Sequence, residues 1–208
     1  MTQASKNKEL DVVCNQIAWL ERYLCELSLL LPPGLSGSTE SLANSTVPHF
    51  FYMVRSLLID SIYLGVGRLL DPEQQGSGKR PRKNMTIECL INSLTCPKTP
   101  RYDKANCRLQ KCRTLFGAGR NARNTTIAHL DYSTVCSSDP STLAALGASY
   151  DTLSDIVFEC QRIIEEIADP NPLPTVSPKN DKRWRGIAAL LDHLRDTKKD
   201  VAWQLTGE

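Results

Sequence analysis

Apolar residues recur at helical spacing along most of the 208-residue chain, and this period constrains the fold more than any other feature. In residues 6–31, leucine, valine and isoleucine return every three or four positions, which places them on one side of an amphipathic helix. Residues 48–70 are apolar almost all round, so this helix should be the buried centre of a bundle. No stretch alternates between apolar and polar residues with a period of two. The sequence therefore predicts an all-α fold.

Proline, glycine and capping residues divide the chain into further helices. Gly117 and Gly119 should loosen the backbone just ahead of Arg120 and Arg123. The other expected boundaries, in chain order, are a stop at Pro32-Pro33-Gly34, a start at Pro48, a stop at Asp71-Pro72, a basic loop over 72–83, a helix over 85–95 capped by Asn84, breaks at Pro97 and Pro100, a helix from about 102, and a helix from about 140 to 168 capped by Asp139.

A proline-rich stretch separates a main domain from an extension. The length of 208 residues suits one domain, or one domain plus an extension. We expect a helical domain over residues 1–168 with about four core helices, followed by a stiff linker over 169–180. Residues 181–208 should form a C-terminal helical extension that packs on the same domain.

Composition is that of an ordinary globular protein, with 41% hydrophobic and 23% charged residues. We expect no apolar run of membrane-spanning length. Residues 1–9 are polar and lack the hydrophobic stretch of a secretory signal. A cytoplasmic protein with no membrane partner is therefore expected.

The eight cysteines are expected to be reduced, because no secretory signal precedes them. Most fall on or near apolar helical faces, where small core residues belong. A zinc site made of Cys107, Cys112, His129 and Cys136 is the alternative, but it lacks a Cys-x-x-Cys pair and the usual spacing. We therefore expect no metal and no cofactor.

The charge of the chain is unevenly placed. Its net charge is only +2, yet residues 79–123 carry twelve Lys/Arg against two acids, a local net of +10. Such asymmetry favours a polyanion partner, while the alternative is a solvated basic loop and helix. Only Tyr102 and Phe116 interleave with these charges, so a base-stacking platform is not expected. The candidate nucleic-acid contacts are Lys79, Arg80, Arg82, Lys83, Lys104, Arg108 and Lys111.

A short motif, Arg123-Asn124-x4-His129, closes this basic segment. An arginine grips phosphate through its planar fork, and a histidine moves protons near neutral pH. On a straight helix six residues advance about 9 Å and turn about 240°, so the two side chains would diverge. They converge if a helix begins or ends between them, or if they meet across a subunit interface.

The string Arg123-Asn124-Thr125-Thr126-Ile127-Ala128-His129-Leu130-Asp131 resembles the signature of the HEPN superfamily, and in particular its abortive-infection U-type branch. A second patch is similar to the same branch, from Arg55-Ser56-Leu57-Leu58-Ile59-Asp60 through Arg68-Leu69-Leu70-Asp71-Pro72 to Asn84-Met85-Thr86-Ile87. The resemblance covers about residues 10–165. It implies a small helical bundle and a metal-independent ribonuclease that acts as a toxin or phage-defence effector. It also implies paired chains that bring two copies of the motif to one cleft.

Under this hypothesis the motif supplies the chemistry. His129 would act as general acid or base, Arg123 would stabilise charge on the scissile phosphate, and Asn124 would fix the phosphate or the imidazole. Asp131 could orient the imidazole. Asp60 and Arg120 are supporting candidates, since Asp60 lies in a helix that we expect to be buried and a buried carboxylate needs a partner.

Two alternatives stay open. A lone histidine is often a packed or surface residue, and a lone arginine is often a solvated charge. The chain could instead be a non-catalytic module that binds RNA or a partner protein, such as a nucleotidyltransferase or an antitoxin. Because one histidine cannot readily serve as base and acid at once, we expect a homodimer with a composite site.

Overall fold

The computed structural model describes residues 3–30, 48–75, 82–122 and 149–168, with short pieces at 186–187, 189–190 and 192–193. The described chain is helical, apart from two strands of two residues each. The all-α prediction is therefore confirmed. The helices are α1 (Gln3–Ser28), α3 (Pro48–Leu70), α4 (Ile87–Leu94), α5 (Pro100–Leu115), α6 (Gly117–Ala122) and α8 (Tyr150–Ile167).

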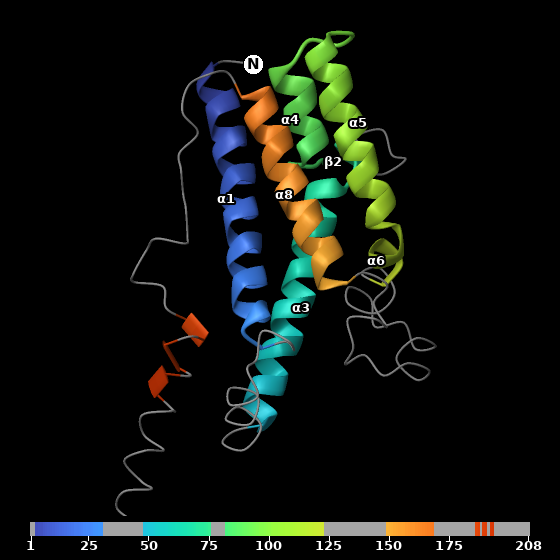
Figure 1. The fold of residues 1–208 in the computed structure, drawn as a ribbon. Coiled ribbons are helices and arrows are strands. Elements are labelled where there is room, and N and C mark those ends of the chain that lie inside the picture. The colour runs from blue at the N-terminus through green and yellow to red at the C-terminus, as the bar shows by residue number, and fades with distance from the viewer. Residues whose placement is uncertain are drawn as a thin grey trace, which may run out of the picture.

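The long helices lie side by side, with α8 between α1 and α5 (Figure 1). Helix α3 packs along α1, and α4 fills the space against α5 and α8. One hydrophobic core joins these helices, and their inward side chains are almost fully buried. Its largest members include Leu20, Tyr63, Leu90, Phe116 and Leu153.

Hydroxyl side chains cap the helices that frame the site. Thr86, Thr99 and Ser149 each accept a hydrogen bond from the backbone N–H three residues later, which satisfies one of the free donors of the first turn. The prediction that Asn84 caps α4 is therefore wrong, because Thr86 is the cap. The amide of Asn84 instead donates to the carbonyl of Pro72 at 3.1 Å. Pro100 does not break the chain but begins α5, because the first turn of a helix does not use the missing N–H.

Helix α3 differs between its two halves. From Ile59 to Leu70 its inner face lies in the core. Phe50, Met53 and Leu57 recur at helical spacing on the N-terminal half, yet they are 40%, 52% and 57% exposed. The expectation that this whole helix is the buried centre of the bundle is therefore wrong for its first half, which projects beyond the other helices (Figure 1).

Residues His49–Leu70 are also long and apolar enough to cross a membrane, by length and composition alone. The expectation that no run reaches that length is thus wrong for α3. Helix α3 packs against α1, α4, α5, α6 and α8, and the inner face of its C-terminal half lies in the core, as in the core helix of a globular protein.

The ends of the expected basic loop over 72–83 are paired. Strand β1 (Gln74–Gln75) and strand β2 (Arg82–Lys83) form a short antiparallel ladder, with Gln74 opposite Lys83. Residues 76–81 lie outside the described chain.

Part of the C-terminal extension lies against the end of α1. The carboxylate of Glu26, 8% exposed, accepts a hydrogen bond from the backbone N–H of Ile187 at 2.8 Å and pairs with Arg22. Ile187 and Leu190 pack with a small cluster formed by Leu30 and Phe51. Residues 123–148, with the expected cap Asp139, and residues 169–185, with the expected linker, are outside the described chain.

Candidate functional site

The motif residues follow directly after helix α6 in the sequence. Helix α6 ends at Ala122, and the next residue is Arg123. Arg123, Asn124, His129 and Asp131 all lie outside the described residues. The described chain gives the geometry of the helices that lead into the motif.

Helix α6 is pressed onto α5 and α3 through a glycine. A Cβ added at Gly119 would lie 2.7 Å from the ring of Phe116 and 3.1 Å from the ring of Tyr63. Both rings are fully buried, with centroids 5.9 Å apart. The expectation that Gly117 and Gly119 loosen the backbone is wrong, because both lie in α6 and the absent side chain of Gly119 permits close packing.

Arg120 points at the C-terminal end of α3. One terminal nitrogen of its guanidinium donates to the carbonyl of Leu70 at 3.4 Å. Its Nε is buried and has no hydrogen-bond partner in the described chain. A cation near a helix C-terminus is favourable, because the last carbonyls carry partial negative charge. The described contact of Arg120 is thus with helix α3, and its supporting role in a site stays a prediction.

Asp60 lies one helical turn before Tyr63 on α3 and is half-buried. Burial raises the pKa of its carboxyl group above the ordinary value. No ion pair to Asp60 is present in the described part of the chain. The guanidinium of nearby Arg55 lies 5.8 Å from the ring centroid of Tyr52. A half-buried carboxyl group with a raised pKa and no ion pair among the described residues is a candidate functional group.

The cations of α5 are largely engaged within the molecule. Lys104 pairs with Glu166 at 2.6 Å, and Arg108 pairs with both Glu159 and Glu166 of α8. Arg101 donates to the carbonyls that end α8. RNA phosphates would therefore have to compete with the carboxylates of α8 for Lys104 and Arg108, and the contact of these two residues with RNA stays a prediction. Lys111 is exposed.

The remaining basic candidates flank the β-ladder. Lys83 pairs with Glu73 at 3.3 Å and is 51% exposed. Arg82 belongs to β2 through its backbone. Lys79 and Arg80 lie outside the described residues.

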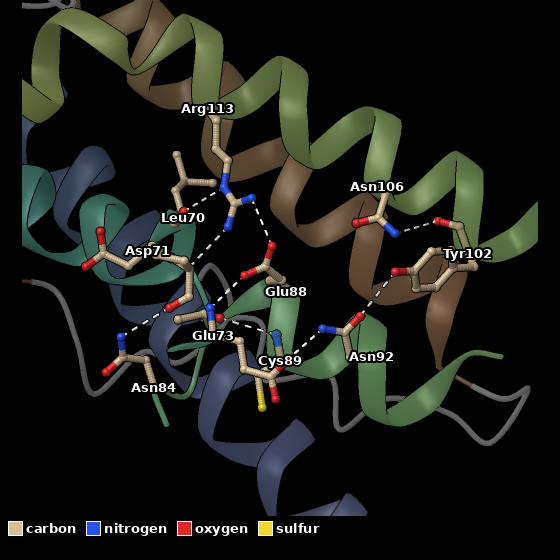
Figure 2. Close-up of polar contacts among 12 residues, drawn as sticks. Leu70, Asp71, Glu73, Asn84, Glu88, Cys89, Asn92, Tyr102, Asn106 and Arg113 are labelled. Atoms are coloured by element: carbon tan, nitrogen blue, oxygen red, sulfur yellow. Dashed lines mark hydrogen bonds and ion pairs between the residues drawn. The ribbon is translucent and has the colours of Figure 1, made fainter. Parts of the chain in front are cut away.

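An arginine that the sequence did not single out organises the end of α3. Arg113 donates to the carbonyls of Leu70 and Asp71 at 2.8 and 3.3 Å, and to the carboxylate of Glu88 at 3.1 Å (Figure 2). Glu88 also accepts from the backbone N–H of Glu73 at 2.6 Å. Burial alone would raise the pKa of Glu88, but these hydrogen bonds and the charge of Arg113 lower it overall. The helix stop at Asp71-Pro72 was the only sequence signal near this network.

The described chain contains no group of three or more His, Cys, Asp or Glu that would hold a metal ion. Of the expected alternative zinc ligands, Cys107 is exposed and Cys112 is buried, so the two thiols do not share one environment. His129 and Cys136 are outside the described residues. Cys112 of α5 and Cys160 of α8 are both buried.

Comparison with protein families agrees with the residues quoted above. Residues 7–169 match the family model of AbiU2, a HEPN family. A search of curated proteins and a search of solved structures found no match. The matched range begins within α1, spans the other described helices through α8, and includes the sequence of the Arg-Asn-x4-His motif. The chain therefore belongs to the AbiU2 family of HEPN proteins.

Proposed function

We propose that this protein is a metal-independent RNA endonuclease, acting in the cytoplasm as a toxin or abortive-infection effector. The family, whose name points to abortive infection, supports the general role. The observation that carries the proposal is local. The motif begins one residue after α6, and α6 is packed against Tyr63, one turn from the half-buried carboxyl of Asp60.

The proposed reaction uses the 2′-hydroxyl of RNA as the nucleophile. His129 removes the proton of that hydroxyl, or protonates the leaving 5′-oxygen. The 2′-oxygen attacks phosphorus as the bond to the 5′-oxygen breaks, which gives a 2′,3′-cyclic phosphate and a free 5′-hydroxyl. Arg123 stabilises the charge that builds on the phosphate, and Asn124 positions it.

Two further carboxylates have supporting roles in this proposal. Asp131 orients the imidazole of His129, as carboxylates commonly do. Asp60 lacks an ion pair in the described chain, so an arginine at the site is its natural partner.

The proposed assembly is a homodimer with a composite site. Base and acid must be in opposite protonation states at the same time, and two copies of His129 meet that need. The surface of α3 favours pairing as well, since Phe50, Met53 and Leu57 form one exposed apolar stripe on the side away from the core. Light scattering should report about 46 kDa, twice the 23.2 kDa of one chain. A strict monomer that cleaves RNA would contradict the composite site.

The direct test is incubation of the purified protein with mixed RNAs in EDTA. The wild type should cleave and leave 2′,3′-cyclic phosphate ends, while His129→Ala and Arg123→Ala should be inactive. His49→Ala and His193→Ala are matched controls, because they remove the other two histidines of the chain and should cleave normally. Cleavage that persists in His129→Ala, or that requires added Mg²⁺, would refute the assigned roles.

A non-catalytic RNA-binding or protein-binding module is the second candidate. It is favoured by the basic strip from Lys79 to Lys83, which includes one exposed lysine in the described chain. Its partner would be RNA, a nucleotidyltransferase or an antitoxin. Such a module should lose RNA affinity when Lys79, Arg80, Arg82 and Lys83 are neutralised, and its affinity should then depend less on salt. His129→Ala should leave its binding unchanged.

A further inference from the structure

Helix α6, which precedes the motif, lies in close contact with Phe116 at the end of α5 and with Tyr63 of α3. Gly119 faces two buried aromatic rings, and no side chain fits at its position without displacing one of them. Gly117, two residues earlier in the same helix, has nothing within 4 Å of an added Cβ. The two glycines of α6 therefore differ sharply in what surrounds them.

A second contact holds α6 at the same place. Arg120 donates to the carbonyl of Leu70, the last residue of α3. The same carbonyl accepts from Arg113 of α5, which is also bound to Glu88 of α4 (Figure 2). Helix α6 is thus bound to the end of α3, at a carbonyl that is also linked through Arg113 to α5 and α4.

A shift of α6 would also move the start of the motif. The helix has six residues and spans about 9 Å, and Arg123 follows it without a linker. The rings of Phe116 and Tyr63 belong to a close-packed core, which yields little to an added atom. An inserted side chain at position 119 would therefore move α6 more readily than the core beneath it.

We propose that Gly119 is a positioning residue, whose close contact with Phe116 and Tyr63 sets the placement of α6 and hence of Arg123. The proposal rests on the RNA cleavage proposed above. It assigns Gly119 no contact with RNA. A misplacement of about 1 Å in a group that contacts the transition state lowers turnover by roughly a hundredfold.

The test compares Gly119→Ala with Gly117→Ala. Both substitutions add one methyl group to α6, but only the first meets side chains. In Gly119→Ala, kcat for RNA cleavage should fall by roughly tenfold to a hundredfold, with KM changed by less than about twofold because the basic contacts are untouched. Gly117→Ala should cleave at the wild-type rate. The double variant Gly119→Ala/Phe116→Leu, which makes room for the new methyl group, should recover part of kcat.

Hydrogen exchange separates displacement from unfolding. In Gly119→Ala, amides of residues 117–122 should exchange faster, while those of α3 and α8 should keep their wild-type protection. If this variant fails to fold, Arg120→Gln is the second variant. It weakens the hydrogen bond to the carbonyl of Leu70 without adding bulk to α6, and it should lower kcat by a few fold.

The outcomes separate the two proposals. A wild type that does not cleave RNA refutes the proposed function, and with it any positioning for cleavage. An active wild type with an equally active Gly119→Ala refutes only the positioning role. Equal losses in Gly119→Ala and Gly117→Ala would also refute it, since they would reflect a general effect of alanine in α6.

Discussion

The α5–α8 side of the bundle and the α3–α6 side differ in how completely their polar groups are paired. On the first, Lys104 and Arg108 both reach carboxylates of α8. On the second, the half-buried carboxyl of Asp60 has no ion pair in the described chain. There too, the buried Nε of Arg120 has no acceptor among the described residues.

The difference shows that the charge of a segment does not reveal which of its cations are available. The net +10 of residues 79–123 is concentrated partly on α5, where cations hold helices together. Unpaired groups that are partly buried cost stability, and proteins retain them where function uses them. The less basic α3–α6 side is therefore the better place to look for reactivity.

The largest expected effect removes Arg113, which joins α5 to the end of α3 and to α4. Arg113→Ala removes three hydrogen bonds and leaves Glu88 with the donor from Glu73 and the carbonyl of Leu70 with the donor from Arg120. The free energy of unfolding should fall by about 2–4 kcal/mol, because partly buried acceptors lose their charged partner. Urea unfolding measures it. Lys111→Ala, at an exposed position on the same helix, is the control and should stay within about 0.5 kcal/mol of wild type. Similar values for both would mean that the network contributes little.

The next effect is a dependence of stability on pH through Glu88. Its pKa is lowered in the folded state, so its stabilising contribution is present above the unfolded value of about 4.3 and is lost as pH falls through the folded value. Thermal unfolding between pH 7 and pH 3 should show a steeper loss of stability for the wild type than for Glu88→Gln. Parallel curves would contradict this assignment.

Asp60 tests the unpaired side with the opposite sign. Its pKa is raised by burial, so the charged form destabilises the fold above the unfolded value of about 3.9. Asp60→Asn should raise the free energy of unfolding at pH 7 by about 0.5–1 kcal/mol, and this gain should vanish in acid. Asp155→Asn, at an exposed position on α8, should change little. If Asp60 also serves the site, its variant should lose cleavage while gaining stability.

The smallest expected effect concerns the ion pairs between α5 and α8. Lys104 is 61% exposed, so Lys104→Ala should cost no more than about 0.5 kcal/mol. In RNA binding, neutralising Lys104 and Arg108 should alter the salt dependence less than neutralising Lys79, Arg80, Arg82 and Lys83. Equal changes in slope would show that the carboxylates of α8 do not withhold these cations from phosphate.

Local signals predicted the helices well. The bounds of α3 at Pro48 and Leu70 match the expected start and stop, because proline acts on the backbone of its immediate neighbours. The inward residues of α5, Ala105, Leu109 and Cys112, follow from helical spacing and are buried.

Local sequence signals failed where the partners of a residue come from other parts of the chain. Asn84 was expected to cap α4, yet the carbonyl of Pro72 takes its amide and Thr86 forms the cap. Gly119 was read as a flexible position because its neighbours Phe116 and Tyr63 meet only in the folded bundle. Arg113 draws its acceptors from α3 and α4, and no local pattern marks such a residue.

For the site, sequence reasoning located Asp60 as a carboxylate in an apolar helix, and the structure finds it half-buried with a raised pKa. The roles of Arg123, Asn124, His129 and Asp131 remain predictions, since these residues lie outside the described chain. Spacing alone does not determine whether two side chains six residues apart converge.

The hydrogen bond between Glu26 and Ile187 has a consequence for where this domain ends. The family match stops at residue 169, but a carboxylate of α1 that is nearly buried is satisfied from beyond that point. A chain shortened to residue 169 would keep the described helices α1 to α8 and still lose the donor to Glu26 and the apolar cover that Ile187 and Leu190 give to Leu30 and Phe51. The family match thus ends before the residues that complete the hydrogen bonding and packing at the end of α1.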